Sequence, residues 1–131
     1  MPFTLNNTLD SEHAVRVEDD GKVGYAYCVA KDGVDGFVWL YNVAEPPASL
    51  EEQGGKAAPL NPPTYVRDVI FHPPQSETDI GFNWVFREGV WECGIYIRSK
   101  LHAIVGKGDR PGWCVLAAED GPLACTLPWA E

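Results

Sequence analysis

The chain contains 131 residues, of which 45% are hydrophobic and 22% are charged, and its formal net charge is −9. This length suits one domain, and the composition is that of a globular protein rather than a disordered or fibrous one. Because the excess of acidic groups repels phosphate backbones and anionic lipid surfaces, we expect neither nucleic acid nor a membrane as a partner.

The start of the sequence has no sign of a targeting segment. No basic region followed by an apolar run occurs there, and no stretch approaches the roughly 18 apolar residues that a membrane span needs. We therefore expect a cytoplasmic protein. Residues 1–11 precede the first expected strand and could be flexible.

Strand patterns begin at residue 14. Residues 14–18 and 23–30 are predicted to pair across Asp19-Asp20-Gly21, a turn sequence whose glycine can take positive φ. Every second residue of 23–30 is small, which predicts a face that a neighbouring layer can approach closely. In the next strand, 37–43, the large side chains are predicted to share one side: Phe37, Trp39, Tyr41 and Val43.

Residues 45–63 interrupt the strand pattern. The segment holds five of the eleven prolines together with Gly54 and Gly55, and proline removes the amide that a β-ladder needs. We predict a long Pro/Gly-rich loop with one short helical turn, because Ser49 and Glu52 have capping-box spacing. Such a loop serves either as plain surface packing or as a lid over a binding site.

The clearest element is a hairpin of residues 80–87 and 90–98 around Glu88-Gly89. A tight turn there, or a four-residue loop in the same register, places the large apolar side chains on one face. The predicted pairs on that face are Phe82 with Ile95, Trp84 with Cys93, and Phe86 with Trp91. The opposite face is mixed, which suits water or a polar cavity.

Further strands are predicted at 65–72, 101–105, 113–118 and 123–127. The total is about eight short strands with frequent turn signals and few helix signals. This pattern indicates a mainly β, single domain over 1–131, built as an antiparallel sandwich or a small barrel.

The cysteines and histidines carry no metal-binding pattern. Neither a C-x-x-C pair nor an H-E-x-x-H or H-x-H arrangement occurs, so we expect no metal and no cofactor. The cysteines are interpreted as small buried residues, with a disulfide or redox role as the alternative. The residues concerned are Cys28, Cys93, Cys114 and Cys125, and His13, His72 and His102.

Three features could take part in chemistry or binding. His72 ends an apolar strand, and Glu77 and Asp79 follow it, so that a base and an acid could meet there; an ordinary strand-end histidine is the alternative. The loop 106–112 combines glycines with two cations, the ingredients of an anion-binding nest, although a plain hairpin connection also explains it. Large aromatic side chains either line a pocket or close the core.

Two functions are compatible with these observations. Motifs for a nucleophile or a phosphate loop are missing, so we favour a non-catalytic cytosolic interaction module, inhibitor or immunity-like, whose acidic surface binds a basic protein partner. The alternative is a small-molecule-binding sandwich or barrel, with or without catalysis, whose pocket of at least about 300 Å³ lies near His72 and the 45–63 loop. A homodimer is compatible with both. The residues predicted to bind a ligand are His72, Arg98, Lys107, Arg110, Trp39 and Tyr41.

Overall fold

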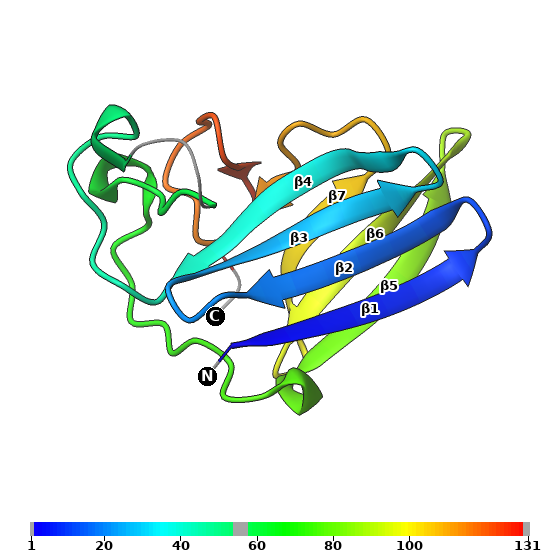
Figure 1. Cartoon of the computed structure of the whole chain (residues 1–131), viewed down its shortest axis with the longest axis horizontal. Helices are drawn as coiled ribbons and strands as arrows, with labels where there is room; N and C mark the ends of the chain where they lie inside the picture. Colours follow the sequence, from blue (N-terminus) through cyan, green and yellow to red (C-terminus); the bar gives the residue numbers. More distant parts are fainter. Residues whose placement is uncertain (1, 54–57, 130–131) are drawn as a thin grey trace.

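The structure, a computed structural model, describes residues 2–53 and 58–129. Its strands form two sheets that pack face to face (Figure 1). The first sheet is antiparallel and consists, in spatial order, of β1 (Phe3–Asp10), β2 (His13–Asp19), β3 (Val23–Ala30) and β4 (Gly33–Asn42). The second consists of β5 (Ile80–Arg87), β6 (Val90–Ile97), β7 (Lys100–Gly106), β8 (Trp113–Cys114) and β9 (Cys125–Thr126). Its last pair, β8 with β9, is parallel.

The predicted fold class is confirmed in its sandwich form, since the two sheets of the described ranges do not close into a barrel. The helices described here are single 3-10 turns, and none of them is long or apolar enough to cross a membrane. These turns are η1 (Glu51–Gln53), η2 (Pro63–Tyr65) and η3 (Glu77–Asp79).

The small-residue face of β3 is confirmed, and it points into the core. Ala26 is fully buried there. At Gly24 the ring of Tyr41 lies so close that an added Cβ would be 2.4 Å from its Cζ atom. The absence of a side chain at Gly24 therefore makes room for the Tyr41 ring between the sheets.

The β5–β6 hairpin has the predicted register, with Trp84 opposite Cys93 and Phe86 opposite Trp91. Its turn is the tight form, because Glu88 and Gly89 both have positive φ, at 53° and 84°. Burial of the apolar face ends before the tip: Trp84 packs against the core, whereas Phe86 is 57% exposed.

Several segments differ from the sequence-based expectation. Residues 3–10, within the segment expected to be outside the sheet, form the edge strand β1. Residues 65–72 make a single bridge, Val66 with Ala117, instead of a strand, because they run down the end of the sandwich where no neighbouring strand offers a ladder (Figure 1). The strands expected at 113–118 and 123–127 are shortened to two residues each.

The long loop 45–63 packs at the end of the first sheet where β4 stops (Figure 1). Its predicted helical turn is present as η1. Asn42, at the end of β4, holds the loop: its Oδ1 accepts from Trp39 Nε1 and from the Asn61 amide, both at 2.9 Å, and its Nδ2 donates to the Asn61 carbonyl at 2.8 Å. The Tyr25 hydroxyl adds a hydrogen bond to the Pro59 carbonyl. Gly54 and Gly55 lie outside the described residues.

The prediction that Trp39 and Tyr41 share one side of their strand is wrong. β4 contains a bulge, since Tyr25 and Gly24 of β3 are paired with Trp39 and Tyr41, two residues apart. The extra residue, Leu40, reverses the facing of the strand beyond it. Trp39 therefore lies under the 45–63 loop, whereas Tyr41 lies between the sheets.

Candidate functional site

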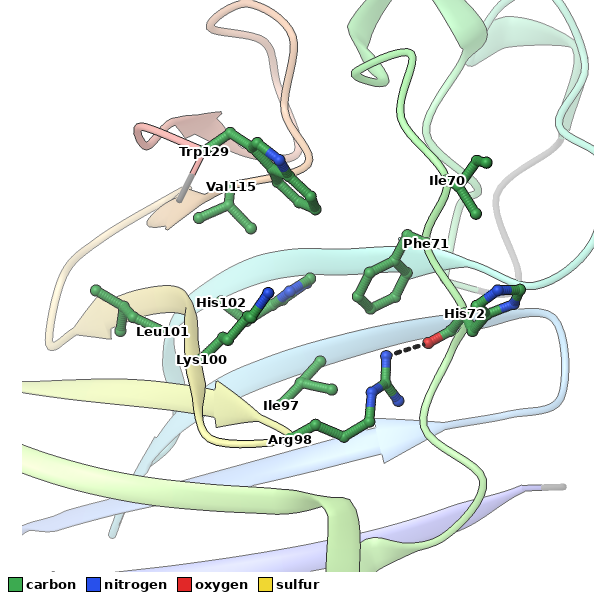
Figure 2. Close-up of a pocket in the computed structure, with 10 residues that line it drawn as sticks. All are labelled: Ile70, Phe71, His72, Ile97, Arg98, Lys100, Leu101, His102, Val115 and Trp129. Atoms are coloured by element: carbon green, nitrogen blue, oxygen red, sulfur yellow. Dashed lines mark hydrogen bonds between the residues drawn. The ribbon is translucent and has the colours of Figure 1, made fainter. Parts of the chain in front are cut away.

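One pocket, of about 220 Å³, lies at the end of the sandwich. Segment 70–72, the β6–β7 turn and the C-terminal stretch surround it. Figure 2 shows the side chains of Phe71, Lys100 and Trp129 around the same space. Ten residues line the pocket: Ile70, Phe71, His72, Ile97, Arg98, Lys100, Leu101, His102, Val115 and Trp129.

Arg67 anchors the segment that carries Phe71 and His72. Its guanidinium donates from Nε to the Val115 carbonyl at 2.8 Å and from Nη2 to two more carbonyls, of Ala117 and Leu127, at 3.4 Å. Its own amide donates to the Leu116 carbonyl at 2.7 Å. One side chain thus ties the irregular segment to the residues after β8 and to the C-terminal stretch, which fixes two walls of the pocket relative to each other.

The β6–β7 turn places Arg98 at the pocket rim. Arg98 and Ser99 have φ of 49° and 68°, a conformation that favours glycine, as the two central residues of a tight hairpin turn. The Arg98 guanidinium donates to the His72 carbonyl at 2.6 Å and lies 5.5 Å from the centre of the Phe71 ring. Figure 2 shows the hydrogen bond to His72. Its Nη1 is 3.8 Å from Asp79 Oδ2, a looser ion pair.

His102 and Phe71 form the aromatic floor of the pocket. Their ring centres are 5.0 Å apart, and Tyr41 packs against both from below, at 6.5 Å from His102 and 6.0 Å from Phe71. His102 Nε2 lies 2.7 Å from the Leu40 carbonyl, so this nitrogen carries the hydrogen and donates. In the neutral ring, Nδ1 is then the hydrogen-bond acceptor.

Burial lowers the pKa of His102 to about 4; the nearby charge of Arg98 also lowers it, and the hydrogen bond to Leu40 opposes the shift. The imidazole is therefore neutral at neutral pH. Because its only N–H is engaged by Leu40, the neutral ring has no donor left for a ligand.

A cysteine lies next to this histidine, although the sequence carries no local pattern that couples them. Cys114 Sγ is 3.6 Å from His102 Nε2 and 3.4 Å from the Leu40 carbonyl oxygen. Cys114 is fully buried, and burial raises the pKa of its thiol to about 12. Because the thiolate is the nucleophile and His102 Nε2 is engaged with Leu40, this pair is packed rather than activated.

Two of the predicted binding residues, His72 and Arg98, lie at this pocket. The contact between them uses the backbone carbonyl of His72, and its imidazole is exposed. The imidazole makes no hydrogen bond or ion pair with Glu77 or Asp79 among the described contacts. Asp79 instead accepts from the Gln75 amide and faces Arg98.

Lys107 and Arg110 lie elsewhere, on the loop beside the start of β4. The amides of that loop already have partners within the protein: Gly106 N donates to the Asp109 carboxylate at 2.8 Å, and Gly108 N donates to the Asp35 carbonyl at 2.8 Å. Arg110 donates to the Val34 carbonyl. The amides of Gly106 and Gly108 are therefore not available to an anion.

Trp39 and Tyr41 are core residues and do not line the pocket. The Trp39 indole is held by Asn42, and the Tyr41 hydroxyl donates to the buried Asp19 carboxylate at 2.8 Å. No described residue of the 45–63 loop lines the pocket either. The described residues of that loop are bonded to Asn42 at the end of β4 and do not form a lid over this site.

The pocket is smaller than the roughly 300 Å³ expected for a drug-sized ligand. A more open groove of about 520 Å³ adjoins it at Arg98 and extends along the start of β5 past Asp79 and Phe82. The enclosed part therefore suits a single ring or a short aliphatic chain.

Other residues of the site were not among the sequence predictions, notably Phe71, Lys100, His102 and Trp129. The sequence did contain a signal for His102, because a histidine within an apolar strand is expected to be buried and to need a hydrogen-bond partner inside the protein. Across residues 2–53 and 58–129, no group of three or more His, Cys, Asp or Glu side chains is placed to hold a metal ion. The four cysteines are free.

Comparisons of the chain with protein families, with curated proteins and with solved structures gave no match. The class of this protein is therefore described from its fold and its candidate site alone. It is a two-sheet β-sandwich with a small, largely apolar pocket at one end.

Proposed function

We propose that this protein binds a small, mainly apolar molecule in the pocket between segment 70–72, the β6–β7 turn and Trp129. The observation that carries the proposal is the composition of the lining, in which apolar and aromatic side chains form the walls and a few polar groups converge from separate elements. Binding sites for small molecules have this character. The volume of about 220 Å³ limits the enclosed part of the ligand to about one ring.

The chemistry of the floor supports binding rather than covalent catalysis. His102 is neutral with one nitrogen engaged by Leu40, and the neighbouring Cys114 is a buried thiol with a pKa raised to about 12. Neither group is prepared to activate a nucleophile. The aromatic packing of Phe71, Tyr41 and His102 instead gives the pocket a fixed shape before a ligand arrives.

The test is a titration of the isotope-labelled protein with 3-phenylpropanamide and 3-phenylpropionate, followed by NMR. We expect saturable shifts of the Trp129 indole signal and of the Phe71 and His102 signals, with a Kd of about 1 mM or tighter for a fragment of this size. Val115→Phe, which fills the pocket, should abolish the shifts. Val85→Phe, on an exposed position of β5, is the matched control. If neither compound shifts the pocket signals, the proposal is wrong.

A second candidate is a protein-interaction module, and the tip of the β5–β6 hairpin favours it. Phe86 and Val90 are 57% and 56% exposed there, and the chain has a net charge of −9. Exposed large apolar side chains and an acidic surface suit a basic protein partner. Binding to cytochrome c, used as a basic probe, should be detectable at low salt and lost at high salt; salt-independent or absent binding would contradict this candidate.

A further inference from the structure

The pocket rim is positively charged in an otherwise acidic protein. Among the lining residues, Arg98 and Lys100 have cationic side chains and none is acidic. The whole chain, in contrast, has 19 acidic and 10 basic side chains. Charge complementarity at a partly desolvated site favours a ligand with a negative group at this rim.

The Arg98 side chain is held in a position from which it can bind a negatively charged group. Its hydrogen bond to the His72 carbonyl and its position over the Phe71 ring hold the guanidinium in place. A guanidinium has five N–H donors, and the contact with Asp79, at 3.8 Å, is longer than a hydrogen bond. The remaining donors can form the paired N–H···O bonds that a planar carboxylate accepts.

His102 determines which end of the ligand faces inward. Its Nε2 donates to Leu40, so the neutral ring offers an acceptor nitrogen and no further donor. A carboxylate against that nitrogen would lose its hydration without gaining a hydrogen bond. The negative end is therefore favoured at the rim, beside Arg98 and Lys100, and the apolar end is favoured at the floor, against Phe71 and Val115.

We propose that the natural ligand is an apolar carboxylate: one ring or a short aliphatic chain, bound with its carboxylate on Arg98 and Lys100. This inference rests on the proposed ligand-binding function and adds the charge and the orientation of the ligand. A free small acid and the C-terminal residue of a peptide share this chemistry.

The experiment compares 3-phenylpropionate with 3-phenylpropanamide, which have nearly the same shape and differ in charge. We expect the acid to bind about tenfold more tightly than the amide, because a charge-assisted pair with arginine replaces a neutral contact. Arg98→Gln should reduce this ratio to about one, and Lys100→Gln should reduce it partly. Arg87→Gln, on the exposed side of β5, should leave the ratio unchanged.

The outcomes separate this inference from the proposed function. Equal affinities for acid and amide in the unmodified protein would overturn the carboxylate inference and leave the pocket's binding function standing. Absence of binding by both compounds would overturn both. An acid preference that persists in Arg98→Gln together with Lys100→Gln would also contradict the assignment.

A second set of ligands distinguishes the two sources of the carboxylate. A tetrapeptide ending in phenylalanine is compared with its C-terminal amide and with 3-phenylpropionate. Binding of the peptide acid more tightly than the small acid supports a peptide C-terminus, accommodated by the adjoining groove past Asp79. Weaker binding of the peptide acid supports a free small acid. A peptide amide that matches the peptide acid would contradict carboxylate recognition.

Discussion

β4 presents two aromatic side chains to opposite sides of the first sheet, and the two sides are covered in different ways. Trp39 is sealed by the 45–63 loop, whose backbone bonds directly to the Asn42 side chain. Tyr41 faces His102 and Phe71, and the segment that carries Phe71 is held by the Arg67 side chain and by backbone bonds to residues 116–118. We call the first the sealed side, because Trp39 is fully buried there, and the second the open side, because the pocket lies there. The segment that packs against each aromatic side chain, and not the strand itself, therefore decides where this pocket remains.

The sealed side should be the more sensitive to a single polar change. Asn42→Ala removes the acceptor of the buried Trp39 indole and of the Asn61 amide, so we expect a loss of about 4 kcal/mol in the free energy of unfolding. Urea denaturation measures this loss. Asn83→Ala, on an exposed position of β5, should change stability by less than about 0.5 kcal/mol. A loss below about 1 kcal/mol for Asn42→Ala would show that the seal depends on apolar packing alone.

The open side should be sensitive to pH through His102. Its pKa is about 4 in the folded protein and 6.5 as the ordinary value, so the unfolded chain binds more protons between these values. The contribution of His102 to stability is therefore fully present above pH 6.5, and it is lost as the pH is lowered toward 4, by about 3 kcal/mol at most.

Urea denaturation at neutral and acidic pH, compared between the unmodified protein and His102→Gln, isolates this contribution from that of the carboxylates. The variant should lose less stability on acidification. His72→Gln, at an exposed imidazole, should retain the full dependence. If His102→Gln and the unmodified protein respond equally to pH, the ring is not buried as described.

On the open side, the Tyr41 hydroxyl donates to the carboxylate of Asp19, the last residue of β2. Burial is the main cause of a raised pKa at this hydroxyl, which therefore remains a donor. Tyr41→Phe leaves the buried Asp19 carboxylate without this donor, and we expect a loss of about 2 kcal/mol in thermal or urea denaturation. Tyr96→Phe, whose hydroxyl bonds to no described residue, is the control. Equal effects of the two changes would contradict a role for the hydrogen bond.

The smallest expected effect is a gain at the β6–β7 turn on the open side. Ser99 has a φ of 68°, and Ser99→Gly relieves that strain, which should raise the unfolding free energy by about 0.5 to 1 kcal/mol. Ser76, with a φ of −158°, is the matched position where glycine should give no gain. Destabilisation by Ser99→Gly would mean that the serine side chain supports the turn in another way.

Parts of the fold that depend on local pairing were predicted well. The β5–β6 hairpin has the expected partners because Gly89 permits the tight turn and because the alternation of Trp84 and Phe86 specifies the register. The bulge at Leu40 was not predictable, since it depends on how β3 and β4 fit together and leaves no local signal in the sequence.

The candidate site was predicted in part. His72 and Arg98 were identified because a strand-end histidine and a turn arginine are visible in the sequence, and both lie at the pocket. Lys107 and Arg110 belong to a loop in which the amides of Gly106 and Gly108 already have partners within the protein, which the glycines alone did not reveal. Residues 65–72 read as a strand from their apolar content, yet a strand also needs a neighbouring edge.

The sequence by itself determined a mainly β chain, its turns and most of its strands, because side-chain alternation and turn residues act over short distances. Only the tertiary structure decided which irregular segments pack against each side of β4 and where a pocket remains between them. The pocket walls come from positions as far apart as Phe71, His102 and Trp129, and their meeting depends on contacts such as those of Arg67 that no local pattern records.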